Sequence, residues 1–178
     1  MKIFRKIVWS GSAGLILALG IDKNLWGLAL VAVALFYRAV CNEQLKQRLT
    51  CAISFGFGFF ICHLTWMQVL GIDAWLLLTL LCVTLFSLIA LVPVVSNSLL
   101  SKLMFASAWV IVEFIRSHYP WGGFSWGLLA YPVNSSHLIM YGRFFGAAGL
   151  TFVLVLIATT ASEIFQAKTI RKLFVLGM

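Results

Sequence analysis

Residues 105–131 read FASAWVIVEFIRSHYPWGGFSWGLLAY, and this stretch combines an apolar run that contains charges with a glycine- and aromatic-rich segment. Its first part is an apolar run that contains a single acidic residue, Glu113, with Arg116 three positions later. At helical spacing Trp109, Glu113 and Arg116 share one face. A charge that faces lipid is costly, so we expect Glu113 to face protein or water and to pair with Arg116, the nearest cation.

The second part of the stretch is rich in glycine and aromatic residues. Gly122 and Gly123 permit backbone conformations that other residues avoid. Tryptophan and tyrosine favour the membrane interface. We therefore expect residues 119–144 to form a re-entrant or interfacial segment, which at membrane depth has to be buried in protein or face a cavity.

The composition indicates an integral membrane protein. Of the 178 residues, 62% are hydrophobic and 10% are charged, whereas soluble domains are about 25% charged. The length suits one domain, residues 1–178, with about six spans. The net charge of +8 does not indicate a nucleic-acid partner, because the basic residues lie between apolar runs and form no continuous patch.

Apolar runs separated by polar turns predict an all-α polytopic membrane protein with a six-span helix bundle. The predicted spans cover residues 7–21, 25–40, 51–70, 74–95, 103–118 and 145–165. Polar loops are predicted at residues 41–50 and 166–172, and residues 173–178 are interpreted as the start of a seventh span. The first run resembles a signal peptide, but apolar runs continue along the chain, so we interpret it as a short transmembrane helix.

The basic residues predict the orientation of these spans. With a cytoplasmic N-terminus and alternating spans, the inner side carries Lys2, Arg5, Lys6, Arg38, Lys46, Arg48, Lys102, Lys168, Arg171 and Lys172, and the outer side carries Lys23, Arg116 and Arg143. Cytoplasmic loops are enriched in lysine and arginine, so this bias supports the orientation. It places residues 119–144 on the outer side.

Few other residues of the sequence are candidates for a catalytic or ligand-binding role. His63 is expected to be a hydrogen-bonded packing residue, with a proton carrier as the alternative. Gly56 and Gly58, ahead of it, suggest a close helix approach or a local kink. The cysteines show no CxxC motif and no metal-ligand spacing, so we expect buried thiols and neither a metal site nor a cofactor. They are Cys41, Cys51, Cys62 and Cys82.

The pattern W-x-x-x-E-x-x-R, then GFSW, then a tyrosine five residues on, resembles the membrane (N-terminal) domain of bacterial apolipoprotein N-acyltransferase. The matching residues are Trp109, Glu113, Arg116, Gly123, Phe124, Trp126 and Tyr131. A small-residue run with Gly146, Gly149 and Phe152 follows this pattern, and a glycine-rich run with Gly56, Gly58 and Trp66 precedes it. Both runs are similar to runs in the family. The sequence departs from the family pattern at Ser125, Ala130 and residues 21–24, where the family has a proline, a glycine and a Phe/Pro-rich turn.

The resemblance implies transfer of an acyl chain from a phospholipid to the N-terminal amine of a diacylglyceryl lipoprotein in the bacterial inner membrane. In that family the membrane half holds the lipids beneath a nitrilase-like domain with a Glu-Lys-Cys triad, which has no counterpart in this sequence. We therefore expect a truncated or split membrane half that is inactive alone and has no catalytic residue, with a separate nitrilase-like chain as a candidate partner. The resemblance implies that the substrate-binding residues are Trp109, Glu113, Arg116, Phe124, Trp126 and Tyr131.

Alternative interpretations stay open. Glu113 and Arg116 also fit a purely structural ion pair, and Trp121, Trp126 and Tyr131 also fit ordinary interface anchors. At the level of function, the alternatives are a lipid-binding membrane scaffold without catalysis and an unrelated small transporter or assembly factor. Against a transporter, the sequence shows no inverted repeat and no paired broken helices.

Overall fold

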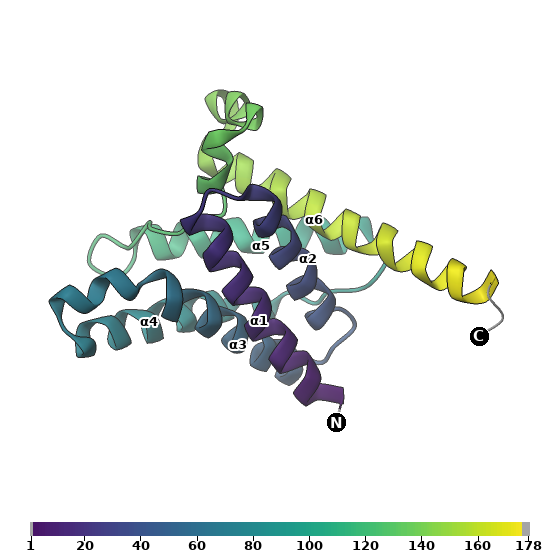
Figure 1. The fold of residues 1–178 in the computed structure, drawn as a ribbon, viewed down its shortest axis with the longest axis horizontal. Helices are drawn as coiled ribbons and strands as arrows, with labels where there is room; N and C mark the ends of the chain where they lie inside the picture. Colours follow the sequence, from purple (N-terminus) through teal and green to yellow (C-terminus); the bar gives the residue numbers. More distant parts are fainter. Residues whose placement is uncertain (1, 176–178) are drawn as a thin grey trace.

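The computed structural model describes residues 2–175, with side chains for residues 3–134 and 136–165, and the described chain folds into helices without strands (Figure 1). The predicted all-α class is confirmed. The α-helices are α1 (Lys2–Asp22), α2 (Trp26–Val40), α3 (Leu45–His63), α4 (Ile72–Ser87), α5 (Leu99–His118) and α6 (Gly142–Val175). The 3-10 helices are η1 (Thr65–Leu70), η2 (Leu88–Leu91), η3 (Tyr131–Ser135) and η4 (His137–Tyr141).

By length and composition, three stretches of the described chain are long and apolar enough to cross a membrane. They are Ile3–Asp22, Ile72–Leu91 and His137–Phe165, and α2 is apolar but shorter. Helices α3 and α5 carry polar residues along their length, for example Lys46 in α3 and Lys102 in α5. The arrangement of six spans therefore stays a prediction.

Consecutive helices run back and forth between two ends of the molecule. At one end, which we term the basic end, Lys6 of α1 pairs with Glu43 between α2 and α3. At the same end Lys102, near the start of α5, pairs with Glu163 of α6. At the opposite end, which we term the loop end, the segments after α1, after α3 and between α5 and α6 come together. Figure 1 shows η3 and η4 protruding in green at the top and α6 extending toward the C-terminus in yellow.

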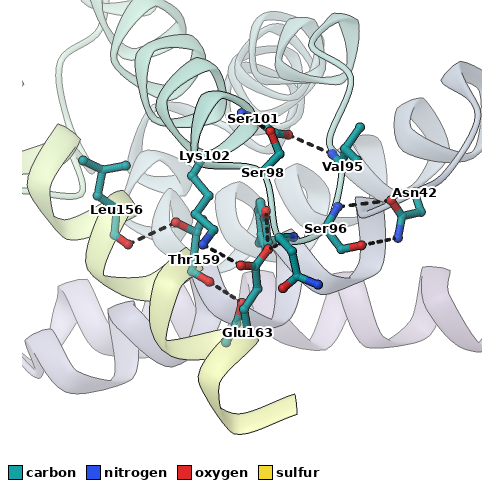
Figure 2. A network of polar contacts seen from close by, with 12 residues as sticks. Asn42, Val95, Ser96, Ser98, Ser101, Lys102, Leu156, Thr159 and Glu163 are labelled. Atoms are coloured by element: carbon teal, nitrogen blue, oxygen red, sulfur yellow. Dashed lines mark hydrogen bonds and ion pairs between the residues drawn. The ribbon is translucent and has the colours of Figure 1, made fainter. Parts of the chain in front are cut away.

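A polar network at the basic end joins three helices (Figure 2). The Glu163 carboxylate lies 2.5 Å from the Lys102 ammonium, and both side chains are largely buried. The same carboxylate accepts hydrogen bonds from the hydroxyl of Tyr37 at 3.1 Å and from the backbone N–H of Asn97 at 2.8 Å. A buried charge is tolerated when it is paired and hydrogen-bonded, so this network fixes α2, α5 and α6 relative to one another.

The centre of the molecule is an aromatic cluster that receives Trp109 from α5. Phe36 of α2 stacks on Phe55 of α3 with ring centroids 4.4 Å apart, and Phe86 of α4 meets Trp109 edge-on at 5.2 Å. All four rings are buried. Aromatic pairs in these geometries contribute about 0.5–1.5 kcal/mol beyond their buried area. The cluster therefore holds the indole of Trp109 in one orientation.

Glycines allow α1 to lie directly against α3. A Cβ atom at Gly14 would lie 2.1 Å from the carbonyl oxygen of Phe55, and one at Gly58 would lie 2.3 Å from the carbonyl oxygen of Gly11. Side-chain atoms cannot occupy these positions, so the two backbones are in contact. The predicted close approach is confirmed for Gly58, whereas Gly56 faces α4.

Helix α3 and the segment after α4 correct two predicted boundaries. Helix α3 begins at Leu45, inside the predicted loop 41–50, because the Gln47 side chain accepts from the backbone N–H of Gln44 at 3.2 Å and caps the first turn. It ends at His63 and not at residue 70. Helix α4 continues from Ser87 directly into η2, and this helical segment ends at Leu91 and not at residue 95, since proline at position 93 lacks an N–H and disfavours helix in the residue before it.

The loop predicted for the C-terminal part of the chain is wrong, because α6 is longer than predicted. Residues 166–172, predicted as a basic loop, continue the helix to Val175. No glycine or proline occurs between residues 161 and 176, and alanine, glutamine, lysine and arginine favour helix. Residues 173–175 therefore continue the sixth helix and do not start a seventh span, and residues 176–178 lie outside the described part. Near its start, α6 is interrupted at Gly146, with φ 63° and ψ −169°.

Candidate functional site

Glu113 is buried in α5 and accepts hydrogen bonds from three parts of the chain. The indole N–H of Trp109, one helical turn earlier, donates to Oε1 at 3.1 Å, and the backbone N–H of Leu129 donates to the same oxygen at 2.8 Å. The hydroxyl of Thr151 in α6 donates to Oε2 at 2.9 Å. One carboxylate therefore joins α5, α6 and the segment of residues 119–130, which we term the outer loop after the side of the membrane predicted for it from the sequence.

Arg116 binds the backbone of the outer loop. Its Nη1 donates to the carbonyl oxygens of Phe124 at 3.0 Å and Trp126 at 2.5 Å, and its Nη2 donates to that of Gly127 at 3.3 Å. The guanidinium also lies 5.3 Å from the centroid of the Phe60 ring, within the range of a cation–π interaction. Arg116 is only 2% exposed, so loop carbonyls and an aromatic face replace water around its charge.

The predicted ion pair between Glu113 and Arg116 is wrong. Among the described residues, the ion pairs of this chain include neither side chain. The two residues share a helix face, as predicted, but each binds a different section of the outer loop. The local spacing on α5 did not reveal that the loop backbone provides both with partners.

The outer loop has an irregular backbone that depends on its glycines. Trp121, Gly122, Gly123 and Gly127 all have positive φ angles, at 51°, 92°, 77° and 74°. A Cβ atom at Gly123 would lie 2.1 Å from the backbone of Ser117, whereas one at Gly122 would meet no atom within 4 Å. The loop therefore folds tightly onto the end of α5, as its glycine content suggested.

The aromatic residues of the outer loop gather around Trp66, which follows α3. The ring centroid of Trp66 lies 5.2 Å from that of Trp126 and 6.5 Å from that of Phe124. The hydroxyl of Tyr131 donates to the carbonyl oxygen of Ser125 at 2.9 Å. These rings are partly exposed at the loop end. Through the loop backbone, the structure brings all six predicted site residues into one connected unit.

Two polar contributors, Thr151 and Asp22, were not predicted. Thr151 lies in an apolar run, where a threonine gives no signal of its own. Asp22 and His63 form a contact at 2.6 Å between a carboxylate oxygen and Nδ1. The His63 ring also stacks on Phe59, with centroids 5.2 Å apart. The interpretation of His63 as a hydrogen-bonded packing residue is confirmed, but its partner 41 residues away was not expected.

Two cavities of more than 500 Å³ flank the outer loop. The first, of about 520 Å³, lies between α4 and the loop, and we term it the α4 cavity. Its lining includes Leu77, Leu81, Leu85, Cys82, Arg116 and Trp121. The second, of about 770 Å³, lies between the turn after α1, residues 130–143 and the start of α6, and we term it the α6 cavity. Both volumes fall in the range of about 300–1,000 Å³ that is usual for ligand sites.

The cysteines of the described chain are free thiols. Cys51 and Cys82 are buried as predicted, Cys41 is half-buried, and Cys62 is exposed, contrary to the prediction. Burial raises the pKa of the Cys41 thiol, in the turn after α2, which keeps it protonated and weakly nucleophilic. Within the described residues, no group of three or more His, Cys, Asp or Glu side chains could hold a metal ion.

A comparison with protein families gives a match over most of the chain. The family profile described as the apolipoprotein N-acyltransferase N-terminal domain matches residues 13–160. The matched range runs from α1 into α6. It therefore includes the outer loop, both residues that fix it in place and the residues that line the two cavities.

Proposed function

Because the chain belongs to the apolipoprotein N-acyltransferase family, as its N-terminal membrane domain, we propose that it holds lipid acyl chains for the N-acylation of lipoproteins. The substrates would be a phospholipid as acyl donor and a diacylglyceryl lipoprotein as acceptor, in the bacterial inner membrane. The observation that carries the proposal is the α4 cavity, which has an apolar side, a cation and a wall made by the outer loop.

The α4 cavity has the chemistry that an acyl chain requires. Leu77, Leu81 and Leu85 line it from α4, and the side chain of Leu77 is 68% exposed on the surface of the helix. An acyl chain that moves from the bilayer to such a surface stays among apolar groups, so no polar group has to be desolvated for it to enter. We propose that the chain enters from the bilayer past these leucines.

The six site residues divide into two roles in this proposal. Trp109, Glu113 and Arg116 are buried and act as positioning residues, since Glu113 and Arg116 bind the outer loop and Trp109 donates to Glu113. Arg116 also lines the α4 cavity, where its positive charge favours an ester or phosphate oxygen at that end. Phe124 lines the same cavity, and Trp126 and Tyr131 form the exposed part of the loop end, where we place the lipid entrance.

We assign the orientation with the N-terminus in the cytoplasm and the loop end outside. The alternation of the helices supports this assignment, since it gathers Lys6, Arg38, Lys46, Arg48 and Lys102 toward the basic end. Basic residues near the ends of spans are retained on the cytoplasmic side.

We assign the acyl-transfer chemistry to a nitrilase-like domain on a separate chain, above the loop end. Trp121 of the outer loop is 96% exposed, and exposed tryptophans are typical of binding surfaces. The membrane domain would then contribute substrate holding and not a nucleophile.

Photo-crosslinking tests whether the α4 cavity holds an acyl chain. A phospholipid with a photoreactive group on its acyl chain would be added to the purified protein, and the labelled peptides would be identified by mass spectrometry. We expect labelling of residues around the α4 cavity and its reduction in Leu81→Trp, whose larger side chain narrows the cavity. Leu80→Trp is the matched control, because Leu80 is exposed on α4 and does not line the cavity. Equal labelling of both variants would overturn the proposal.

Complementation tests the assignment of the chemistry. The chain would be expressed in cells depleted of their own N-acyltransferase, alone and together with a nitrilase-like domain, and triacylated lipoprotein would be measured. We expect product only in the co-expression. Product from the chain alone would refute the assignment to a separate chain, whereas product from neither would refute substrate holding for this reaction.

A further inference from the structure

A smaller cavity at the loop end is lined by the buried Glu113 and is not used by the acyl-chain proposal. It has a volume of about 220 Å³ and lies between the end of α5, the outer loop and the start of α6. We term it the α5 cavity. Among the described residues, its lining has no member in common with that of the α4 cavity, and it shares Ala147 with the α6 cavity.

Helix α5 presents polar groups to this cavity from one face. Glu113 and Ser117 are one helical turn apart, and His118 follows directly. Residues three, four, seven and eight positions apart form one stripe along a helix, and the lining positions 110, 113, 114, 117 and 118 have this spacing. Ala148 of α6 also lines the cavity, and its small side chain leaves room for a ligand.

The Glu113 carboxylate has capacity for one more hydrogen bond. A carboxylate offers about four lone-pair positions. Oε1 accepts from Trp109 and Leu129, and Oε2 accepts from Thr151. One position on Oε2 is therefore left for a donor, and three donors from the protein already stabilise the charged form of the group.

The other polar groups of the cavity can also accept hydrogen bonds. Nδ1 of His118 lies 2.8 Å from the carbonyl oxygen of Phe114, which only accepts, so Nδ1 carries the proton and Nε2 is an acceptor in the neutral ring. The hydroxyls of Ser117 and Ser125 form no hydrogen bond within the described residues. No lysine or arginine of the described chain lines the cavity.

We propose that the α5 cavity binds a small primary ammonium group. Such a group carries a positive charge and three N–H donors, which match a carboxylate surrounded by neutral acceptors. An anion would meet the carboxylate without a cation to bind it, and a quaternary ammonium has no N–H to donate. The volume is below the range of about 300–1,000 Å³ that is usual for ligand sites, so the cavity accepts an amine with a few carbon atoms.

Two kinds of molecule present this group, a free small amine and the amino terminus of a peptide. Saturation-transfer NMR of the purified protein in detergent measures both. The probes are propylammonium, its neutral analogue 1-propanol and propyltrimethylammonium, together with triglycine amide and its N-acetylated form. We expect propylammonium to bind at least about tenfold more tightly than the other two propyl compounds, the ratio for one hydrogen bond to a charged group.

The peptide probes identify the source of the amine. Tighter binding of triglycine amide than of propylammonium, abolished by N-acetylation, would assign the site to a peptide terminus. Weaker binding of the peptide would assign it to a free amine. Equal binding of propylammonium, 1-propanol and propyltrimethylammonium would overturn the proposal.

Variants that leave Glu113 in place locate the binding. Ser117→Ala and Ser125→Ala each remove one acceptor and should weaken propylammonium binding about two- to tenfold. Ala148→Leu narrows the cavity and should abolish binding, whereas Thr160→Leu, at an exposed position of α6 outside the lining, is the matched control.

Thermal unfolding without ligand verifies that each variant is folded, and the serine variants test the site even if Ala148→Leu is unstable. Unchanged binding in both serine variants, or the same effect of Ala148→Leu and Thr160→Leu, would refute the site. The site does not depend on acyl transfer, and the crosslinking of Leu81→Trp reports on the α4 cavity separately.

Discussion

The Glu113 carboxylate in α5 and the Thr151 hydroxyl in α6 lie 2.9 Å apart, although 38 positions separate them in the sequence. Between them the chain forms the outer loop, η3 and η4. The same carboxylate binds the N–H of Leu129 at the end of the loop. A single buried group therefore fixes both helices and the loop between them.

Removal of the Glu113 carboxylate should destabilise the protein strongly. Glu113→Ala leaves the buried N–H groups of Trp109 and Leu129 without an acceptor, at a cost of about 1–3 kcal/mol each. Glu113→Gln retains one oxygen and should lose less. Thermal unfolding in detergent measures both changes, with Ile111→Ala on the exposed face of α5 as the control. A Glu113→Ala protein as stable as the control would contradict the network.

A double-mutant cycle should show whether Glu113 interacts more strongly with Thr151 or with Arg116. Thr151→Val should cost about 1 kcal/mol alone and little in the Glu113→Ala background, because its acceptor is then already gone. The coupling energy of Glu113 with Arg116 should be smaller, since no hydrogen bond joins them. A larger coupling energy of Glu113 with Arg116 than with Thr151 would support the ion pair that was predicted from the sequence.

The two adjacent glycines of the outer loop should differ in their tolerance of alanine. Gly123→Ala places a Cβ 2.1 Å from the backbone of Ser117 and should displace the loop. Gly122→Ala has open space and should cost only the strain of a positive φ, roughly 1–2 kcal/mol. Crosslinking of an acyl-chain probe to the α4 cavity should fail in the first variant and persist in the second. Similar behaviour of the two would show that the loop is not tightly packed on α5.

The contact of α1 with α3 should depend on Gly14. A Cβ there would lie 2.1 Å from the carbonyl oxygen of Phe55, so Gly14→Ala forces the helices apart and should lower the melting temperature. Gly27→Ala in α2 meets no atom within 4 Å and should stabilise the protein by about 0.5–1 kcal/mol. If Gly14→Ala also raises the melting temperature, helix propensity and not close contact governs that site.

Reporter fusions should reveal the orientation. We expect a fusion after Pro132 to report from outside the membrane and a fusion after Lys168 from the cytoplasm. The reason is the accumulation of basic residues at the basic end. A periplasmically active and a cytoplasmically active reporter at each position serve as mutual controls. The reverse pattern would exclude the proposed orientation.

The residues of the candidate site could be predicted from the sequence, but their partners could not. The helical face of Trp109, Glu113 and Arg116 follows from spacing alone, and the glycine-rich loop follows from composition. The acceptors of Arg116 are backbone carbonyls, and a donor to Glu113 is a backbone N–H 16 positions away. Backbone groups are identical in every residue, so no sequence pattern indicates which of them meets a buried charge.

The helix boundaries show a related limit. The start of α3 was predicted at Cys51 and lies at Leu45, because polar residues were interpreted as loop although a helix readily begins with them. In the same way, the basic residues after Phe165 were interpreted as a loop, although nothing in them stops the helix. Polarity indicates where a chain meets water and is a weak indicator of where a helix ends. The lining of the α6 cavity by Asp22 and Arg143 is tertiary and could not be predicted from spacing.

The network at the basic end has a consequence for biosynthesis. Lys102 is largely buried, and its partner Glu163 is synthesised 61 positions later (163 minus 102). Glu113 likewise receives its bond from Thr151 only when α6 has left the ribosome. During translation the first five helices thus contain two buried charges whose contacts are incomplete, which is costly in a membrane. The sixth helix therefore supplies the last partners of both buried charges, so the contacts of Lys102 and Glu113 are complete only after its synthesis.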